Sequence, residues 1–149
     1  MNTSALQQIL NTTLDLTKQM MLCLDRENAC LVTRQYQQLI ETAEHKQQLA
    51  EQLEQQDLQR QQLAAGIPFE QYLMAQGDQS AQRCWEAIGY NVKLCAEKNQ
   101  INGRLLQRQH QITQATIATI TGRGDNSNRV YDANGQTSAQ TSLLPNIEA

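Results

Sequence analysis

Apolar residues recur at steps of three and four along most of the chain, and this spacing constrains the fold more than any other feature. Side chains at such steps gather on one face of an α-helix, whereas a strand places them at every second position. The first stripe predicts an amphipathic helix over residues 4–31, with Ser4 and Gln7 as a capping box at its start. Its apolar members are Leu6, Ile9, Leu10, Leu16, Met20, Cys23 and Leu24.

A second stripe predicts a helix over residues 34–64. No glycine or proline occurs between residues 32 and 34, so this start is inferred from a change of phase and from Thr33 as a possible N-cap. Acidic residues lie largely on the polar side of this helix. If it packs antiparallel to the last helix, we expect its carboxylates to attract Lys93, Lys98, Arg104 and Arg108.

The clearest interruption of the helical pattern is Gly66-Ile67-Pro68. Glycine suits the position after a helix and proline the first turn of the next one, so the chain reverses here. A short helix over 68–76 then ends at Gly77, and Asp78 can cap a long helix over 78–121. The stripe of this long helix consists of Ala81, Trp85, Ile88, Val92, Cys95, Asn99, Asn102, Leu106, Thr113, Ile117 and Ile120.

The helix predicted over 78–121 should be longer than the other two long helices. At 1.5 Å per residue, the first two helices would be roughly 40–45 Å long and the third about 66 Å. From about Asn102 onward, the last helix therefore either bends back, with Gly103 as the weak point, or carries apolar residues that nothing covers.

The composition changes at Gly122, after which too few apolar residues remain to offset the chain entropy of ordering. We therefore predict a helical domain over residues 1–121 and a flexible C-terminal tail over 122–149. The predicted fold is all-α, an elongated antiparallel helical bundle or coiled coil of three long helices plus a short connecting helix.

Several classes of protein are disfavoured by composition. The longest apolar run, residues 20–24, is far shorter than the roughly 20 residues of a membrane span. The N-terminus has no Lys or Arg ahead of an apolar stretch, so it does not resemble a secretory signal, and we expect a cytoplasmic protein. The net charge is −3 with mixed signs, which argues against a nucleic-acid partner.

The four cysteines fit small buried hydrophobes in a reducing compartment better than a zinc site or a redox pair. Cys23 and Cys30 lie seven residues apart, Cys84 and Cys95 eleven apart, and the sequence has no C-x-x-C. A metal-dependent or redox-dependent helical bundle that uses these thiols remains a weaker hypothesis.

Neither histidine suggests catalysis. A di-iron bundle needs Glu three residues before a His, but Thr42 precedes His45 and Gln107 precedes His110 at that distance. Nucleophile-elbow, phosphate-loop and H-E-x-x-H motifs are missing as well. We therefore expect no enzyme activity, no cofactor and no small-molecule substrate.

Three segments together resemble the FlgN family of flagellar export chaperones. They are Cys84-Trp85-Glu86-Ala87-Ile88, then the stretch 99–106 with its Asn-x-x-Asn-Gly-x-Leu-Leu pattern, and the stretch 130–138 with its Tyr-x-Ala-x-Gly-Gln-Thr-Ser pattern. The resemblance is clear over 84–138 and general before that. The spacer 123–128 and the last residues depart from the family pattern.

The resemblance implies a cytosolic type III export chaperone for the two hook–filament junction proteins, FlgK and FlgL. Such a protein holds its clients before export and brings them to the cytosolic domain of the export gate protein FlhA. The family places client binding in the C-terminal region and associates the tail tyrosine with gate docking. By motif position, Tyr131 and Gly135 are the expected gate-binding residues.

The resemblance and the uncovered helix indicate the same client-binding region. The expected client-binding residues are Asn99, Asn102, Leu105, Leu106, Ile112, Ile117 and Ile120. An amphipathic helix of a client could lie against the apolar members of this set. The alternative is that these residues close the bundle internally or join two copies, as in a self-associating coiled-coil scaffold. A homodimer in the absence of client is compatible with either function.

Overall fold

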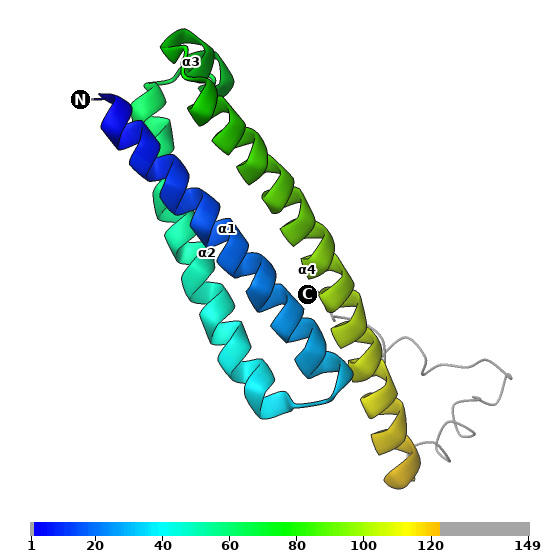
Figure 1. The fold of residues 1–149 in the computed structure, drawn as a ribbon. Helices are drawn as coiled ribbons and strands as arrows, with labels where there is room; N and C mark the ends of the chain where they lie inside the picture. The colour runs from blue at the N-terminus through cyan, green and yellow to red at the C-terminus, as the bar shows by residue number, and fades with distance from the viewer. Residues whose placement is uncertain (1, 123–149) are drawn as a thin grey trace, which may run out of the picture. The chain divides into compact units, whose positions relative to one another are not determined.

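The computed structural model describes residues 2–122, and all regular structure in that range is helical (Figure 1). The elements are α1 (Asn2–Val32), α2 (Tyr36–Ala64), α3 (Phe69–Gln76) and α4 (Gln79–Ile120). Three long helices and one short helix confirm the predicted all-α fold. Each predicted boundary lies within two residues of the observed one.

Two of the predicted helix caps are wrong. Helix α1 already includes Asn2, so Ser4 lies inside the helix, and the Gln7 amide donates forward to Asn11 Oδ1 at 3.2 Å. Before α2, the N-cap position belongs to Gln35, which makes no capping bond with its side chain. The Thr33 hydroxyl instead donates to the Ala29 carbonyl of α1 at 2.7 Å, because the α1 pattern of bonds continues past its last residue.

The predicted stop signals around α3 are confirmed. Helix α2 ends with Ala65 in the left-handed region (φ 49°), and Gly66 follows at φ 85°. Helix α3 ends at Gly77, which is also left-handed at φ 66°. Asp78 caps α4, since its Oδ1 accepts the backbone N–H of Ser80 at 2.9 Å and of Ala81 at 3.2 Å.

The chain forms two compact units. Unit 1 ends at Asn102 and unit 2 begins at Gly103, of which the structure describes residues up to 122. Both units contain part of α4. The predicted boundary between a helical domain and a tail, at 121–122, stays a prediction because residues 123–149 lie outside the described range.

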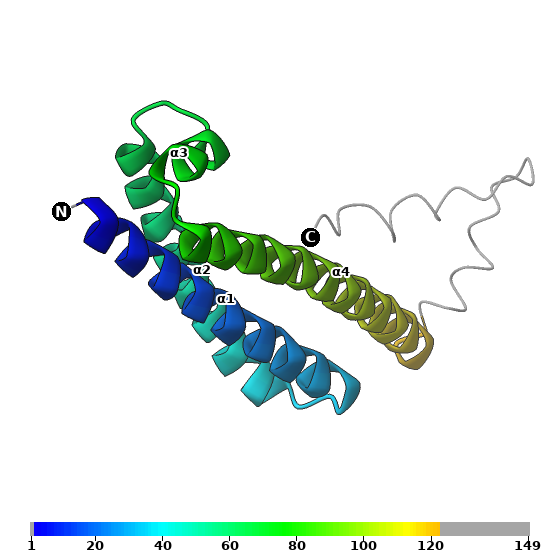
Figure 2. The same cartoon turned by 45° about the horizontal axis from the view of Figure 1, so that its top comes forward.

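In unit 1, α2 runs antiparallel to α1 and to the unit 1 part of α4, and α3 lies where α2 ends and α4 begins (Figures 1 and 2). The core has two parts. One joins all four helices, and the other joins α1 to α2 with Cys95 of α4 against it. The buried members of the first part are Leu6, Leu10, Ala64, Phe69, Tyr72, Leu73, Ala81 and Ile88, and those of the second are Leu16, Met20, Cys23, Leu24 and Leu49.

None of the helices in residues 2–122 combines the length and the apolar character that a membrane-spanning segment requires.

Candidate protein-binding site

Unit 2 carries a stripe of uncovered apolar side chains on α4. The exposed fractions are 50% for Leu106, 47% for Ile112, 44% for Ile117 and 79% for Ile120, while Leu105 is half-buried. At 3.6 residues per turn, these five residues fall within an arc of about 140° of the helix, with Arg104 and Arg108 outside it. We refer to Leu105, Leu106, Ile112, Ile117 and Ile120 as the unit 2 stripe.

Two threonines add to the apolar character of this stripe. The Thr113 hydroxyl donates to the Gln109 carbonyl at 2.9 Å, and the Thr116 hydroxyl donates to the Ile112 carbonyl at 2.9 Å. Because each hydroxyl is bonded to the helix's own backbone, the side chain offers mainly its methyl group to a neighbour. The surface between the large apolar residues is therefore less polar than the sequence suggests.

Asn102, one of the expected client-binding residues, is buried in unit 1 with only 3% of its surface exposed. Its Nδ2 donates to the Leu24 carbonyl at 2.9 Å and to the Glu27 carboxylate at 3.0 Å, and its Oδ1 accepts from Asn28 at 3.0 Å. A partner could reach this amide only after these bonds opened. Its role in client binding remains a prediction.

Asn99 belongs to the same polar network. This residue is exposed, and its Oδ1 accepts a hydrogen bond from the Lys46 ammonium of α2. Lys46 also pairs with the buried Glu27 carboxylate at 3.2 Å. We call Glu27, Asn28, Lys46, Asn99 and Asn102 the polar network, which joins α1, α2 and α4 at the last residues of unit 1.

The expected attraction between the acidic face of α2 and the basic residues of α4 is not found in residues 2–122. Lys98 pairs with Asp25 of α1 at 2.6 Å, and Arg60 of α2 pairs with Asp57 of the same helix. The reason is that α1 also packs against α4 and offers a carboxylate there. Both partners of the Lys98–Asp25 pair are largely solvated, so it is worth about 0–1 kcal/mol.

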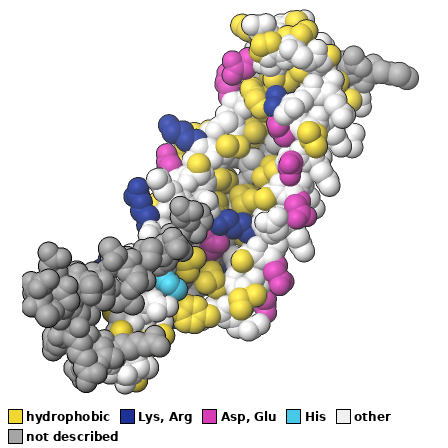
Figure 3. Space-filling model, turned by 180° about the vertical axis from the view of Figure 1, so that it is seen from behind, with side chains coloured by type: hydrophobic (Ala, Val, Ile, Leu, Met, Phe, Trp, Pro, Cys, Tyr) yellow, Lys and Arg dark blue, Asp and Glu magenta, His cyan; other side chains and the backbone are white. Residues whose placement is uncertain are grey.

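A hollow of about 260 Å³ lies between α1, α2 and α4 in unit 1. Figure 3 shows hydrophobic side chains along this side of the molecule. Val92 and Asn99 of α4 both line the hollow, and Val92 is half-exposed. The sequence analysis placed Val92 and Cys95 on the apolar stripe of the long helix but did not predict an opening beside them. The lining residues are Thr17, Met20, Leu24, Lys46, Leu53, Val92, Cys95, Ala96 and Asn99.

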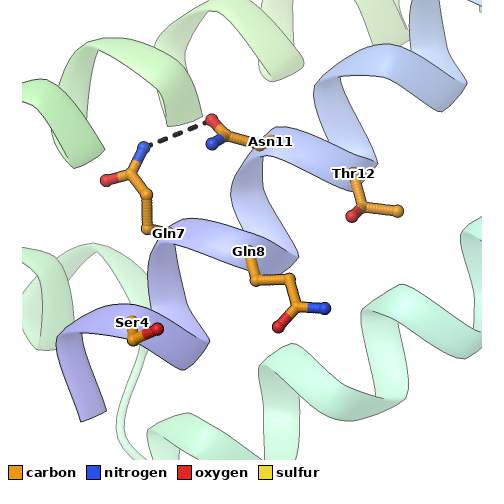
Figure 4. Close-up of a pocket in the computed structure, with 5 residues that line it drawn as sticks. All are labelled: Ser4, Gln7, Gln8, Asn11 and Thr12. Atoms are coloured by element: carbon orange, nitrogen blue, oxygen red, sulfur yellow. Dashed lines mark hydrogen bonds between the residues drawn. The ribbon is translucent and has the colours of Figure 1, made fainter. Parts of the chain in front are cut away.

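A second, open hollow at the start of α1 is lined by Ser4, Gln7, Gln8, Asn11 and Thr12 (Figure 4). These side chains are amides and hydroxyls, and one hydrogen bond joins Gln7 to Asn11. With no ionisable side chain in its lining, this hollow offers neither an acid–base pair nor a charge for ligand recognition.

Cys23 and Cys30 are buried as expected, whereas Cys84 and Cys95 are only half-buried. Burial raises the pKa of Cys23, Cys84 and Cys95 above the ordinary value, because a thiolate would lose its hydration. For Cys23, the Glu27 carboxylate raises the pKa further, while Lys46 and Arg26 oppose the shift. Among residues 2–122, no group of three or more metal-ligating side chains comes together. A protonated, buried thiol is a poor nucleophile and a poor metal ligand.

The expected gate-binding residues, Tyr131 and Gly135, lie outside the described residues.

Comparison with known families gives one match. The family model described as FlgN protein covers residues 1–139, which include all three segments that carry the resemblance. No curated protein and no solved structure shows a significant match to the chain. A family model that covers nearly the whole chain, together with an all-helical fold, identifies this protein as a member of the FlgN family of flagellar export chaperones.

Proposed function

We propose that this protein is a cytoplasmic chaperone that binds the hook–filament junction proteins FlgK and FlgL through α4 and delivers them to the cytosolic domain of the export gate protein FlhA. Family membership supports the general role of a flagellar export chaperone. The observation that carries the proposal is the unit 2 stripe, an apolar surface with large side chains that nothing covers within the described residues.

The client contact is an amphipathic helix laid along the unit 2 stripe. Fully burying a Leu or Ile side chain is worth about 1.5–3 kcal/mol, so covering side chains that are half-exposed yields roughly half of that each. The ordering of both partners consumes part of this gain. The resulting moderate affinity suits a chaperone that must release its client at the gate.

The gate contact uses the tail tyrosine. Tyr131 offers an apolar ring and a hydroxyl at a small cost in side-chain entropy, and such residues often dominate the energy of an interface. Gly135 belongs to the same tail motif. In this division of labour, α4 holds the client and the tail engages FlhA.

The alternative is a self-associating coiled-coil scaffold, in which the unit 2 stripe of one copy packs on that of another. The same uncovered side chains support it, so the two functions must be separated by experiment. Light scattering after size-exclusion chromatography, with and without purified FlgK, would do so. The chaperone function predicts a FlgK complex, whereas a dimer that ignores FlgK would favour the scaffold.

The test of the client site is Leu106→Asp, with Gln107→Asp as the matched control. Both residues are exposed on α4 and both variants add the same charge, but position 107 faces away from the stripe. We expect Leu106→Asp to weaken FlgK binding at least tenfold by calorimetry, and Gln107→Asp to leave it nearly unchanged.

Helical content and thermal unfolding of both variants should match the parent chain, because neither residue is buried. Equal FlgK affinity for the two variants would contradict the assignment of the stripe. A Leu106→Asp variant that loses helical structure would show instead that Leu106 supports the fold.

A further inference from the structure

A slot lies where α3 meets the start of α4 in unit 1, and none of its lining residues is assigned above to client or gate. Its volume is about 260 Å³. We propose that this slot binds a partner polypeptide segment in which an apolar side chain is flanked by Lys or Arg. The slot is lined by Glu70, Leu73 and Met74 of α3 and by Gln82, Trp85 and Glu86 of α4.

The apolar part of the slot is held in place by the core. Leu73 is buried, and Trp85 meets the edge of the Phe69 ring with centroids 4.7 Å apart. The Arg60 guanidinium lies 5.3 Å from the Trp85 ring centroid. Because these neighbours fix the indole, a ligand meets a surface that is already formed, and little ordering is needed on binding.

Met74 gives the slot an adaptable wall. It is 73% exposed on α3, although Leu73 beside it is buried. A methionine side chain is flexible and polarisable, so it can fit apolar groups of different shape. An exposed methionine next to a partly exposed tryptophan suits recognition of an aliphatic side chain.

The charge of the slot is negative. Glu70 comes from α3 and Glu86 from α4, and neither makes an ion pair or a hydrogen bond within residues 2–122. Arg83 of α4 makes no ion pair with them, and Arg60 is already paired with Asp57 at 2.6 Å. A Lys or Arg side chain of a partner would therefore supply the positive charge with which the two carboxylates can pair.

The helix ends nearby do not reverse this sign. The C-terminus of α3, at Gly77, carries a partial negative charge, and the N-terminus of α4, beside Asp78, carries a partial positive one. Each amounts to about half an elementary charge, so the two largely cancel. Glu70 and Glu86 are then the charged side chains in the lining of the slot.

These features together select the occupant. An acidic segment would be repelled, and an uncharged apolar segment would dehydrate two carboxylates without compensation. A segment with Lys or Arg beside a leucine offers a cation to the two carboxylates and an apolar side chain to the apolar part of the slot. Exposed ion pairs contribute about 0.2–1 kcal/mol each, so binding should be weak and sensitive to salt.

The experiment uses the full chain and its intrinsic fluorescence, because Trp85 is the only tryptophan. The probes are a synthetic Ac-Lys-Leu-Lys-Leu-Lys-NH₂ peptide and the matched Ac-Glu-Leu-Glu-Leu-Glu-NH₂ peptide. We expect the basic peptide to change the Trp85 emission in a saturable, salt-sensitive manner, and the acidic peptide to have no effect.

The decisive variant is Glu70→Gln with Glu86→Gln, compared with Glu44→Gln and Glu54→Gln on α2. Both double variants change the net charge equally, and all four side chains are exposed, so folding should be kept. We expect the slot variant to weaken binding of the basic peptide about two- to thirty-fold and the control to leave it unchanged. Melting curves for both variants should match the parent.

Four outcomes would overturn the proposal. They are no response to the basic peptide, an equal response to both peptides, equal weakening by the two double variants, and a change of Trp85 emission with protein concentration alone. The last would assign the slot to a second copy of the chain. FlgK binding through the unit 2 stripe is measured separately, so loss of either interaction leaves the other interpretable.

Discussion

The two units use the same helix in opposite ways. In unit 1, α4 contributes Ala81 and Ile88 to a buried core, and its Asn91 and Asn102 are buried as well. In unit 2, none of residues 103–122 is buried. The apolar spacing of α4 continues from unit 1 into unit 2, but α4 residues are buried only in unit 1. A periodic apolar stripe therefore marks the apolar face of a helix, but it does not show whether other residues of the chain bury that face.

Truncation of one leucine in each unit should give the largest contrast. Leu10→Ala removes a side chain with 1% exposure from the unit 1 core and should cost about 2–5 kcal/mol. Leu106→Ala should change the free energy of unfolding by less than about 0.5 kcal/mol. Urea unfolding followed by circular dichroism measures both. A comparable loss for Leu106→Ala would mean that unit 2 has an internal core after all.

The polar network should give the next largest effect. Asn102→Ala leaves the Glu27 carboxylate and the Asn28 amide each without one buried partner, which should cost about 1–3 kcal/mol. Asn99→Ala is the matched control, because that amide is exposed and water can replace it. Equal destabilisation by the two variants would show that the burial of Asn102 does not increase its contribution to the free energy of unfolding.

Thiol labelling compares accessibility in the two units. Cys23 is buried with a raised pKa, whereas a cysteine introduced by Ile117→Cys occupies an exposed position of unit 2. We expect iodoacetamide to label position 117 at least ten times faster at neutral pH, as measured by mass spectrometry of the peptides.

The pH dependence of this labelling follows from the raised pKa of Cys23. A raised pKa means that Cys23 becomes a thiolate only at higher pH, so its labelling rate should rise later than that at position 117. Coincident pH profiles would contradict the shielding of Cys23.

Two glycines of α4 should give the smallest difference. Gly89 in unit 1 and Gly103 in unit 2 are both helical, and a Cβ at either position would meet nothing within 4 Å. Gly89→Ala should raise the free energy of unfolding by about 0.5–1 kcal/mol. Gly103→Ala should raise it by less than about 0.3 kcal/mol, yet slow amide exchange in residues 103–120. An equal global gain would mean that the two units unfold together.

Local features were the part of the fold that the sequence predicted best. The Asp78 cap and the stop at Gly77 depend only on residues that are close in the sequence, so the local sequence pattern is enough to predict them. Ser4 and Thr33 fit the cap pattern as well, but α1 already includes Ser4, and the Thr33 hydroxyl bonds back to the Ala29 carbonyl of α1. A cap motif indicates where a helix can begin, and packing decides where it does begin.

The candidate site was predictable only in its apolar part. Helix length indicated that the residues beyond Asn102 either bend back or carry uncovered apolar side chains, and Leu106, Ile117 and Ile120 are exposed. The partners of Asn102 lie on α1, more than seventy residues earlier in the chain, and no local pattern marks such a pairing. The same holds for Glu70 and Glu86, which become neighbours only through the turn between α3 and α4.

The network that closes unit 1 at Asn102 has an evolutionary consequence. Because none of residues 103–122 is buried, substitutions in the unit 2 stripe should carry little penalty on the stability of the fold. Under the proposed function, selection can therefore retune the binding of a client, or adapt it to a diverged one, without first finding compensating changes elsewhere. Under that function, recognition of the client and stability of the fold depend on different parts of one continuous helix.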